Sequence, residues 1–410
     1  MTYFDEKHSG VNYVYNDTDT REFGWRASMV GDGIQNVRIE GIRCVAVDCD
    51  LDDVPDVPIS DETKLWSLPT TWPDGIVPTG GDVEVQAGEN IIYDLEDSPI
   101  FDVVTVNGRL TFMDDVSQHA SLNLNAKHIF VRAGELLIGA ADAPYAAEAR
   151  ITLYGSRTDA QVKMSGTVEA GNKIIANTNL VEFYGAVRDR MTRLEAEVYN
   201  GYTEMLVGTG LDWVAGDKIY FAPTNMQPYH HEYREIASYD AAQGLLTLTE
   251  ALDYYHYGGD ASVADDFNGL DMRGEVILLT RNIRVVAEES NDWGCTIVTA
   301  DRVEADRSVR TGTMILNNVE VYKGGQEDTY KSAIRYEGAA RATTSMVENT
   351  VAWGGNAKPL IIKTSKNITV KNSVFLGGYQ VGIYLQTVDN VHLDGVFLGD
   401  IRRRFTNVNL

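Results

Sequence analysis

The sequence predicts an all-β protein in which a glycine-punctuated strand domain continues into a right-handed parallel β-helix. Three observations lead to this fold class. Short stretches with alternating apolar residues are separated by glycines from about Leu65 to Gly155, and a repeat anchored on valine and glycine follows residue 310. No comparably long segment has apolar residues at the 3.6-residue period of an amphipathic helix. Helix is therefore expected only in fragments.

Between about Leu65 and Gly155 the chain reads as a series of short strands. Apolar residues occupy every second position in Val103-Val-Thr-Val, His128-Ile-Phe-Val-Arg and Ile151-Thr-Leu-Tyr. Successive side chains of a strand point to opposite faces of a sheet, so this alternation predicts strands with one buried face. The glycines between them predict turns.

After residue 310 the chain contains an internal repeat. Its glycines, spaced by 30, 23 and 22 residues, each follow a valine by three positions: Val321 and Gly324, Val351 and Gly354, Val374 and Gly377, Val396 and Gly399. An Asn or Asp lies five or six positions before each glycine: Asn318, Asn349, Asn372 and Asp394. This pattern fits a solenoid whose coils each contribute an inward valine and turn at a residue able to adopt left-handed backbone angles. The dense leucines of a leucine-rich repeat are missing, which favours a parallel β-helix.

The pattern divides the chain into four parts. Residues 1–60 read as the tail of a small β domain and an acidic linker, 61–180 as the glycine-rich strand domain, 181–300 as a β-rich connecting region and 301–410 as β-helix coils. The last coil has no visible polar cap, whereas natural solenoids cover their ends. We therefore expect a truncated stack that belongs to a longer protein, unless a partner or an atypical end hides the same edge.

The charge of the chain narrows the classes of partner. The 410 residues include 60 acidic and 35 basic side chains, which gives a formal net charge of −25. This negative field opposes the binding of polyanions, so nucleic acid is excluded as an expected partner. No cofactor is expected, although calcium is compatible with the charge.

Features of an extracellular protein are present but few. Asn16-Asp-Thr18 and Asn367-Ile-Thr369 are acceptor triplets for N-glycosylation. Cys44 and Cys49 could close a small disulfide loop in a secreted chain, the alternative being reduced, buried thiols. No signal peptide is visible, and no stretch is long and apolar enough to span a membrane.

Several motifs resemble a known family. The G-eight domain, named for its glycines, is similar to Trp66-Ser-x-x-x-Thr-Trp72-x-x-Gly75, Ile129-x-Val131-x-x-Gly134-x-Leu136-x-Ile138-Gly139 and Ile151-Thr-Leu-x-Gly155. Fibrocystin, fibrocystin-like protein and the cell-migration-inducing hyaluronidases resemble the chain at Gly269-Leu-Asp-Met-Arg273-x-Glu275 and its continuation to Ile283. The resemblance covers residues from about 60 to 400. It implies a G-eight domain fused to β-helix repeats, on secreted proteins or ectodomains of single-pass membrane proteins.

Function divides within this family. One branch degrades hyaluronan, whereas the fibrocystin branch forms large surface or ciliary ectodomains. Around Ala333-Ile-Arg335-Tyr336 the hyaluronidase branch has the arrangement Pro-Ile-His-Phe-His, and both histidine positions are replaced here, by Arg335 and Glu337. An imidazole can act as a base or metal ligand, but arginine cannot be deprotonated. If those histidines matter for turnover, this chain should not inherit it.

Three residues are the weak catalytic candidates. His256 lies in an aromatic run and could orient a sugar, the alternative being a buried structural histidine. Asp271, Arg273 and Glu275 alternate along a strand-like stretch and would share one face, where residues two apart lie within the range that separates the paired carboxylates of glycoside hydrolases. Arg273 lies between them, and it favours a salt-bridged lock joining the strand domain to the β-helix.

Two further groups could bind a metal or a glycan. Asp260, Asp265 and Asp266 lie in an acidic loop that could hold calcium, the alternative being solvated loop acids. The adjacent residues His230, His231 and Glu232 are ligand types for a metal, but neighbouring side chains on a strand point apart, so a surface loop is favoured. Aromatic residues that could stack on sugars are Trp353, Tyr379 and Tyr384.

Together these features predict a non-catalytic extracellular structural or adhesion segment of a large fibrocystin-like ectodomain, at the cell surface or on a cilium. Its expected partners are other extracellular chains or the remainder of its own parent protein, with glycans as a further class. The alternative is a polysaccharide-active, hyaluronidase-like or glycan-binding β-helix module. That alternative rests on family analogy alone.

Overall fold

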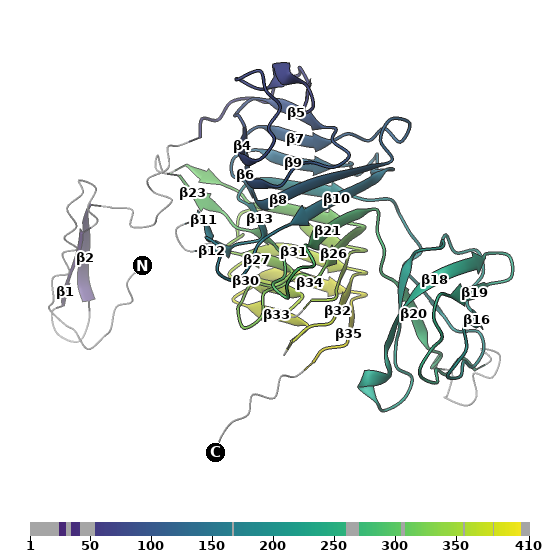
Figure 1. Ribbon diagram of the computed structural model, residues 1–410. Helices are drawn as coiled ribbons and strands as arrows, with labels where there is room; N and C mark the ends of the chain where they lie inside the picture. The colour runs from purple at the N-terminus through teal and green to yellow at the C-terminus, as the bar shows by residue number, and fades with distance from the viewer. Residues whose placement is uncertain are drawn as a thin grey trace.

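The computed structural model describes the backbone of two N-terminal strands and then residues 54–165, 168–259, 270–304, 308–355, 357–379 and 381–402. The two N-terminal strands, β1 (Gly24–Met29) and β2 (Ile34–Gly41), pair antiparallel. In the described residues the only helical elements are two single 3₁₀ turns, η2 (Pro69–Thr71) and η3 (Pro228–His230). The predicted all-β class is confirmed (Figure 1).

The main body is a parallel β-helix with three faces. Its first face is a nine-stranded, wholly parallel sheet. In stacking order these strands are β3 (Lys64–Leu65), β5 (Asn90–Tyr93), β7 (Arg109–Phe112), β9 (Glu135–Ile138), β14 (Leu180–Tyr184), β25 (Thr313–Asn317), β28 (Ser345–Glu348), β31 (Lys366–Lys371) and β34 (Asp389–Asp394).

The second and third faces belong to one 14-stranded sheet, because the long strand β8 (Ser121–Val131) contributes to both. The second face consists of β4 (Gly81–Val85), β6 (Phe101–Val106), the C-terminal half of β8, β13 (Ile174–Asn177), β22 (Thr296–Thr299), β27 (Ile334–Glu337), β30 (Leu360–Lys363) and β33 (Ile383–Gln386). The third face consists of the N-terminal half of β8, β10 (Glu148–Leu153), β21 (Ile283–Ala287), β26 (Val319–Tyr322), β29 (Val351–Trp353), β32 (Val374–Leu376) and β35 (Phe397–Gly399).

The later coils visit the second, first and third faces in that order, as in β27, β28 and β29. Parallel stacking starts at β3, well before residue 301, where the β-helix coils were expected to begin. The same stack continues past residues 180 and 300, two of the boundaries that the sequence pattern indicated. The glycine-punctuated strands are therefore the first coils of the same stack. The predicted parallel β-helix is confirmed.

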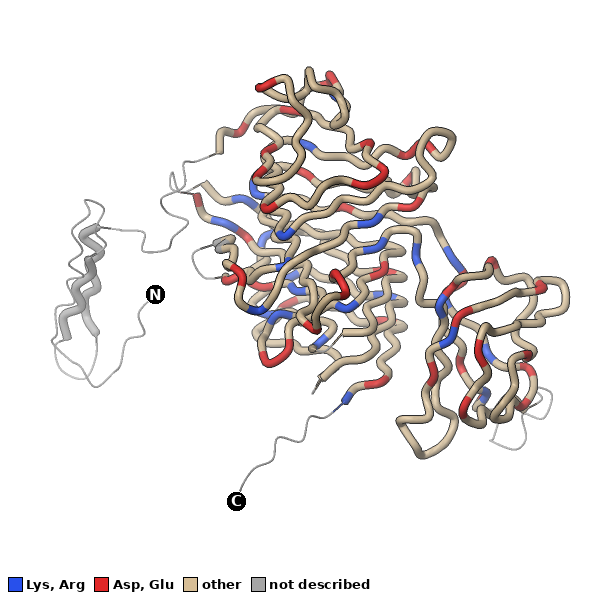
Figure 2. The backbone as a smooth tube through the Cα atoms, in the orientation of Figure 1, with Lys and Arg blue, Asp and Glu red and all other residues tan. Residues whose placement is uncertain are grey.

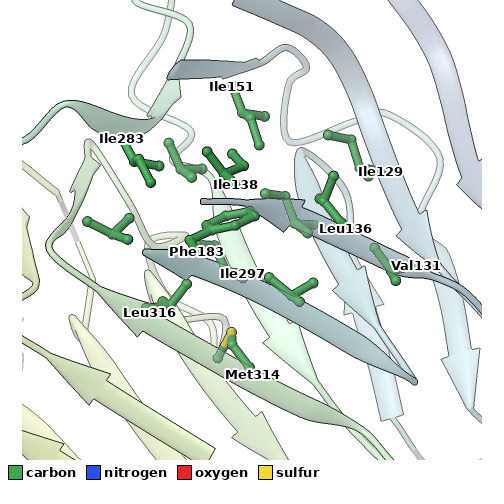
Figure 3. Close-up of a cluster of buried hydrophobic side chains, with 14 of the residues drawn as sticks. Ile129, Val131, Leu136, Ile138, Ile151, Phe183, Ile283, Ile297, Met314 and Leu316 are labelled. Atoms are coloured by element: carbon green, nitrogen blue, oxygen red, sulfur yellow. The ribbon is translucent and has the colours of Figure 1, made fainter. Parts of the chain in front are cut away.

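Rows of inward side chains hold the stack together. On the first face Ile138 lies opposite Phe183, and Phe183 lies opposite Leu316, in successive strands. All three are fully buried, and they pack against inward residues of the other two faces such as Ile151 and Ile297 (Figure 3). Fully burying a side chain of this size contributes about 1.5–3 kcal/mol, so each coil adds several such terms.

The predicted asparagine turns are present between the first and third faces. Asn318, Asn349 and Asn372 have φ values of 56°, 49° and 50°, in the left-handed region that asparagine tolerates better than most residues. In the last coil Gly395, with φ of 60°, takes this place, and not the predicted Asp394.

The register of the repeat corrects one prediction. Val321 points inward, but it pairs with Ala352, and Val351 and Val374 therefore point outward from the third face. A shift of one residue moves a side chain to the opposite face of a strand. The outward valines are nevertheless buried, because a second β structure covers them.

That structure is an insert between β14 and β21, which we call the insert (Figure 1, right). It is a six-stranded antiparallel sheet, in the order β15 (Met191–Arg193), β20 (Glu275–Leu278), β17 (Lys218–Phe221), β18 (Glu232–Asp240), β19 (Leu245–Leu248) and β16 (Glu204–Leu206). One side has its own core around Trp213, Phe221 and Leu278. On the other side Tyr220 and Ile277 pack against the outward residues of β29 and β32.

Two hairpins lie beside the second face. They are β11 (Val162–Ser165) with β12 (Val168–Gly171), and β23 (Arg302–Val303) with β24 (Val309–Arg310). Met164 and Val168 of the first hairpin pack on the outward residues Ile174 and Val298. Within the described residues no helix is long and apolar enough to cross a membrane.

Candidate functional site

His256 is a fully buried residue of the insert with a partner at each ring nitrogen. Nδ1 lies 3.1 Å from the carbonyl oxygen of Ala222, and Nε2 lies 3.0 Å from Oε1 of Glu232. Glu232 also accepts the backbone N–H groups of Asp253 and Tyr254, at 2.7 and 2.9 Å. Both ring nitrogens face acceptors, so His256 acts as a hydrogen-bond donor inside the protein, and no ring nitrogen points to solvent.

Glu232 is an ionised carboxylate in a buried position. Burial alone would raise its pKa, but the hydrogen bonds from His256 and from two backbone N–H groups, with the nearby Arg234 guanidinium, hold that pKa below its ordinary value. Arg234 pairs with both Glu232 and Asp253. The sequence indicated His256 but not its partner, because Glu232 lies 24 positions earlier in the chain and only the fold brings the two side chains together.

Asp271 and Glu275 are both bound by arginine. Arg193 donates to Oε1 of Glu275 at 3.0 Å and lies 3.5 Å from Asp271. Arg273 donates to both oxygens of Asp271 at 2.9 Å and to Glu195 at 2.7 Å. The hydrogen bonds from Arg273 lower the pKa of Asp271 to about 2. This ionic cluster lies within the insert, between β15 and the segment leading into β20.

The second face has an ionic pair at the two positions where the family resemblance implied histidines in a hyaluronidase. Arg335 and Glu337 on β27 pair with each other, and Lys363 of the next coil donates to Glu337 at 2.9 Å. Arg335 also donates to the carbonyl oxygen of Glu169 at 2.8 Å, which ties the β11–β12 hairpin to the stack. Burial would raise the pKa of Glu337, but the charges of Arg335 and Lys363 hold it below its ordinary value. These residues therefore cross-link the fold.

The three adjacent residues His230, His231 and Glu232 have different surroundings. The imidazole of His230, at the end of η3, stacks on Tyr254 with a ring separation of 4.0 Å. His231 lies 3.4 Å from Asp400 of the last coil, and the hydroxyl of Tyr233 also donates to Asp400, at 3.1 Å. His231 therefore connects the insert with the β-helix, whereas Glu232 belongs to the buried pair with His256.

The predicted aromatic positions are separate from one another. Trp353 lies at the interface with the insert, stacked on Tyr233 at 5.7 Å. Tyr384 on β33 lies 5.8 Å from Tyr330, an exposed ring of the loop before β27. Tyr379 is half-buried beside Arg402.

The remaining predicted site residues are mostly beyond the described part. Asn16, Cys44, Cys49, Asp260, Asp265 and Asp266 lie outside the described residues. Asn367 lies on β31, where its amide nitrogen donates to the carbonyl oxygen of Ala342 at 3.0 Å and its oxygen accepts from Asn390 of the next coil at 2.7 Å. Cys295 is a buried thiol whose pKa is raised to about 12 by burial. No group of three or more His, Cys, Asp or Glu in the described segments could hold a metal ion.

Sequence reasoning missed one surface cluster, made of Glu197, Tyr199, Tyr202 and Tyr255. The hydroxyls of Tyr199 and Tyr255 both donate to Glu197, at 2.6 and 3.2 Å. The aromatic run around His256 was a signal for it, but the turn that completes the cluster lies far away in the sequence.

Comparison with known proteins agrees with the sequence motifs. Residues 71–195 match the family model of the G8 domain, a range that starts in η2 and ends just after β15. A G8 domain-containing protein of Dictyostelium discoideum is 26% identical over 236 residues, which is 55% of this chain and 20% of that protein. Human fibrocystin-L is 24% identical over 282 residues, or 64% of this chain and 7% of its own length. Mouse fibrocystin is 31% identical over 225 residues, covering 54% of this chain and 5% of that protein.

Among solved structures, the tailspike gp61 of Pseudomonas phage phi297 superposes with a TM-score of 0.22 and 13% identity, covering 66% of this chain and 42% of the tailspike. The fold assignment rests on the strand pairing within this chain and not on that superposition. The chain spans a fifth or less of the length of each of the three relatives named above. Residues 71–195 thus match the G8 domain, here built as the first coils of a β-helix, and the chain is similar to G8 domain-containing proteins of the fibrocystin type.

Proposed function

We propose that this chain is a rigid, non-catalytic segment of a large fibrocystin-like ectodomain at the cell surface. In this role the stacked coils space and orient neighbouring parts of the parent protein, and contacts with other extracellular chains are made from the surface. The similarity to fibrocystin and fibrocystin-L supports a segment of this kind.

The observation that carries the proposal is the pairing of the catalytic candidates. A general acid must hold a proton near neutral pH, and a base must have a free lone pair aimed at the substrate. Asp271, with a pKa of about 2, is ionised and occupied by Arg273. Glu275 is occupied by Arg193, and His256 is enclosed between Glu232 and Ala222. These groups stabilise the insert, which is a structural role.

The test is a depolymerisation assay on purified protein. Hyaluronan, chondroitin and a neutral β-glucan are incubated with the chain, with and without calcium, and their size distributions are measured by light scattering after gel filtration. We expect unchanged chain lengths, with an authentic hyaluronidase as positive control. Shortening of any glycan that is abolished in a Glu275→Gln variant would overturn the proposal and favour the carbohydrate-active alternative.

A further inference from the structure

The cluster missed by the sequence is an exposed aromatic surface on the insert, which we call the tyrosine patch: Glu197, Tyr199, Tyr202 and Tyr255. The ring of Tyr199 lies 5.9 Å from that of Tyr202 and 5.3 Å from that of Tyr255. Tyr199 and Tyr202 are each 49% exposed. Large aromatic residues at such exposure, grouped on one surface, mark interaction sites more often than scattered apolar residues do.

The turn that carries two of the rings is fixed by hydrogen bonds. The N–H of Tyr202 donates to the carbonyl oxygen of Tyr199 at 3.1 Å, and Gly201 has a φ of 87°, which glycine adopts without strain. The backbone N–H of Gly201 donates to the carbonyl oxygen of Leu252, and the side-chain amide of Asn200 donates to the carbonyl oxygen of Asp253, both at 2.8 Å. The rings are thus held in place before any partner arrives, which lowers the entropic cost of binding.

The buried His256–Glu232 pair supports the third ring. His256 and Val198 form an isolated antiparallel β-bridge with two backbone hydrogen bonds, at 2.9 and 3.1 Å, so the segment of Tyr255 is joined to the segment that leads into the turn. Because His256 points inward to Glu232, its neighbour Tyr255 is directed toward Glu197. This gives the aromatic run around His256 a positioning role.

The patch is electronegative. Its central carboxylate, Glu197, accepts hydrogen bonds from two neutral hydroxyls, which leave its charge in place. The hydrogen bond with Glu197 raises the pKa of Tyr199, and burial, followed by the same carboxylate, raises that of Tyr255 to about 12, so both donors keep their protons. Acidic residues are spread over the insert (Figure 2). Tyrosine ring faces are also regions of negative potential.

We propose that the tyrosine patch docks an arginine- or lysine-bearing segment of a partner protein. Cations are attracted to the face of tyrosine rings, and a carboxylate beside the rings adds a charge-assisted hydrogen bond. The net charge of −25 favours a basic partner and opposes an acidic one. Tyrosine and arginine are also the residues that dominate protein interfaces energetically.

The experiment measures the binding of a labelled peptide of alternating arginine and glycine by fluorescence anisotropy, at low and at physiological salt. Replacing both exposed rings, in Tyr199→Ser with Tyr202→Ser, is expected to weaken binding about tenfold, since each cation–ring contact contributes about 0.5–1 kcal/mol. Glu197→Gln is expected to weaken it about threefold and to reduce its salt dependence. Tyr199→Phe with Tyr255→Phe keeps the rings and should bind within about twofold of the original chain.

The matched control is Tyr330→Ser, which removes a tyrosine of 60% exposure from the β-helix, where Lys358 already lies over the ring. This control should bind the peptide as the original chain does. The proposal is overturned if the original chain does not bind the peptide. It is also overturned if Tyr330→Ser weakens binding as much as the double variant Tyr199→Ser with Tyr202→Ser, which we call the patch variant. It is also overturned if the patch variant loses binding of a neutral β-glucan oligosaccharide instead, which would make the surface a glycan site.

Discussion

The two ends of the β-helix are built differently. At the N-terminal end the segment after β3 folds over the first coil, and the indole ring of Trp66 is fully buried against Trp72, Tyr93 and Phe101, at ring separations of 4.8, 5.4 and 5.6 Å. The indole N–H of Trp72 donates to the carbonyl oxygen of Trp66 at 2.9 Å. This aromatic cap seals the first coil.

At the C-terminal end the inward positions are open. Leu385, Leu393 and Leu398 are 42%, 43% and 46% exposed. Their partners one coil earlier, Ile362, Val370 and Phe375, are almost completely buried. The late coils are held from the side instead, by the insert and by ionic pairs between coils. The exposed fraction of an inward side chain in this stack therefore depends on whether a further coil covers it, and not on the type of side chain.

The largest expected effect is at the cap. Trp66→Ala should lower the free energy of unfolding by about 3–5 kcal/mol, because it removes a fully buried indole and leaves a cavity between three rings. Leu398→Ala at the open end is the matched control and should cost less than about 1 kcal/mol. Urea unfolding followed by tryptophan fluorescence and circular dichroism measures both. Equal losses of unfolding free energy in the two variants would mean that the two ends do not differ in how tightly their side chains are packed.

The next effect concerns Glu337, whose carboxylate pairs with Arg335 of its own strand and with Lys363 of the next coil. Because the pKa of Glu337 is lowered in the folded state from 4.5, its contribution is complete above pH 4.5 and is lost as the pH falls through the folded value. Glu337→Gln should therefore cost about 2–3 kcal/mol at pH 7, since Arg335 is left buried without a counter-charge. The difference between the two proteins should shrink as the pH is lowered from 5 to 3. A difference that is constant over this range would contradict the assignment.

The lateral support by the insert is tested at Trp353. Its indole N–H donates to Glu320 at 3.0 Å, and its ring stacks on Tyr233 of the insert. Trp353→Ala should cost about 2 kcal/mol, less than the loss at Trp66, because this ring is only partly buried. Hydrogen exchange should show faster opening of β32 and β35, while β5 and β7 keep their protection. Uniform loss of protection would indicate that the insert does not stabilise the late coils selectively.

The sequence was sufficient for the fold and for part of its detail. Alternating strands, glycine turns and the asparagine repeat predicted the stack, because these signals depend on neighbours in the chain. The orientation of Val351 and Val374 was predicted wrongly, since a strand covered on both sides has apolar residues on both, and periodicity no longer identifies the inward face. Because the insert covers the outward side of β29 and β32, both sides of these strands are apolar, and the sequence pattern fits either orientation.

The candidate site was harder to predict, because its contacts join distant residues. The sequence showed Arg273 beside Asp271, but Arg193, which binds Glu275, comes from another strand. In the same way Glu337 was recognised as a changed position, whereas its partner Lys363 is set by the register between coils. The tyrosine patch joins two segments that meet at the isolated β-bridge between Val198 and His256, and only the fold places them together.

A smaller effect is expected at the turns of the late coils. Asn349 has a φ of 49°, where an alanine is strained by about 1 kcal/mol and glycine is not strained. Asn349→Ala should lower the unfolding midpoint measurably, while Asn349→Gly should stay close to the original protein. An alanine variant as stable as the glycine variant would mean that the backbone conformation does not limit stability at this turn.

The smallest change in stability is expected at the open end itself, where the consequence is for association. Leu393→Lys with Leu398→Lys should alter unfolding by less than about 0.5 kcal/mol, since both side chains are already nearly half exposed. Charges on an edge discourage pairing with another chain, so the variant should remain monomeric at concentrations where the original chain begins to associate in sedimentation velocity. A matched pair of lysines on the exposed surface, Val187→Lys with Met226→Lys, should leave association unchanged. If both variants behave alike, net charge and not the open edge controls association.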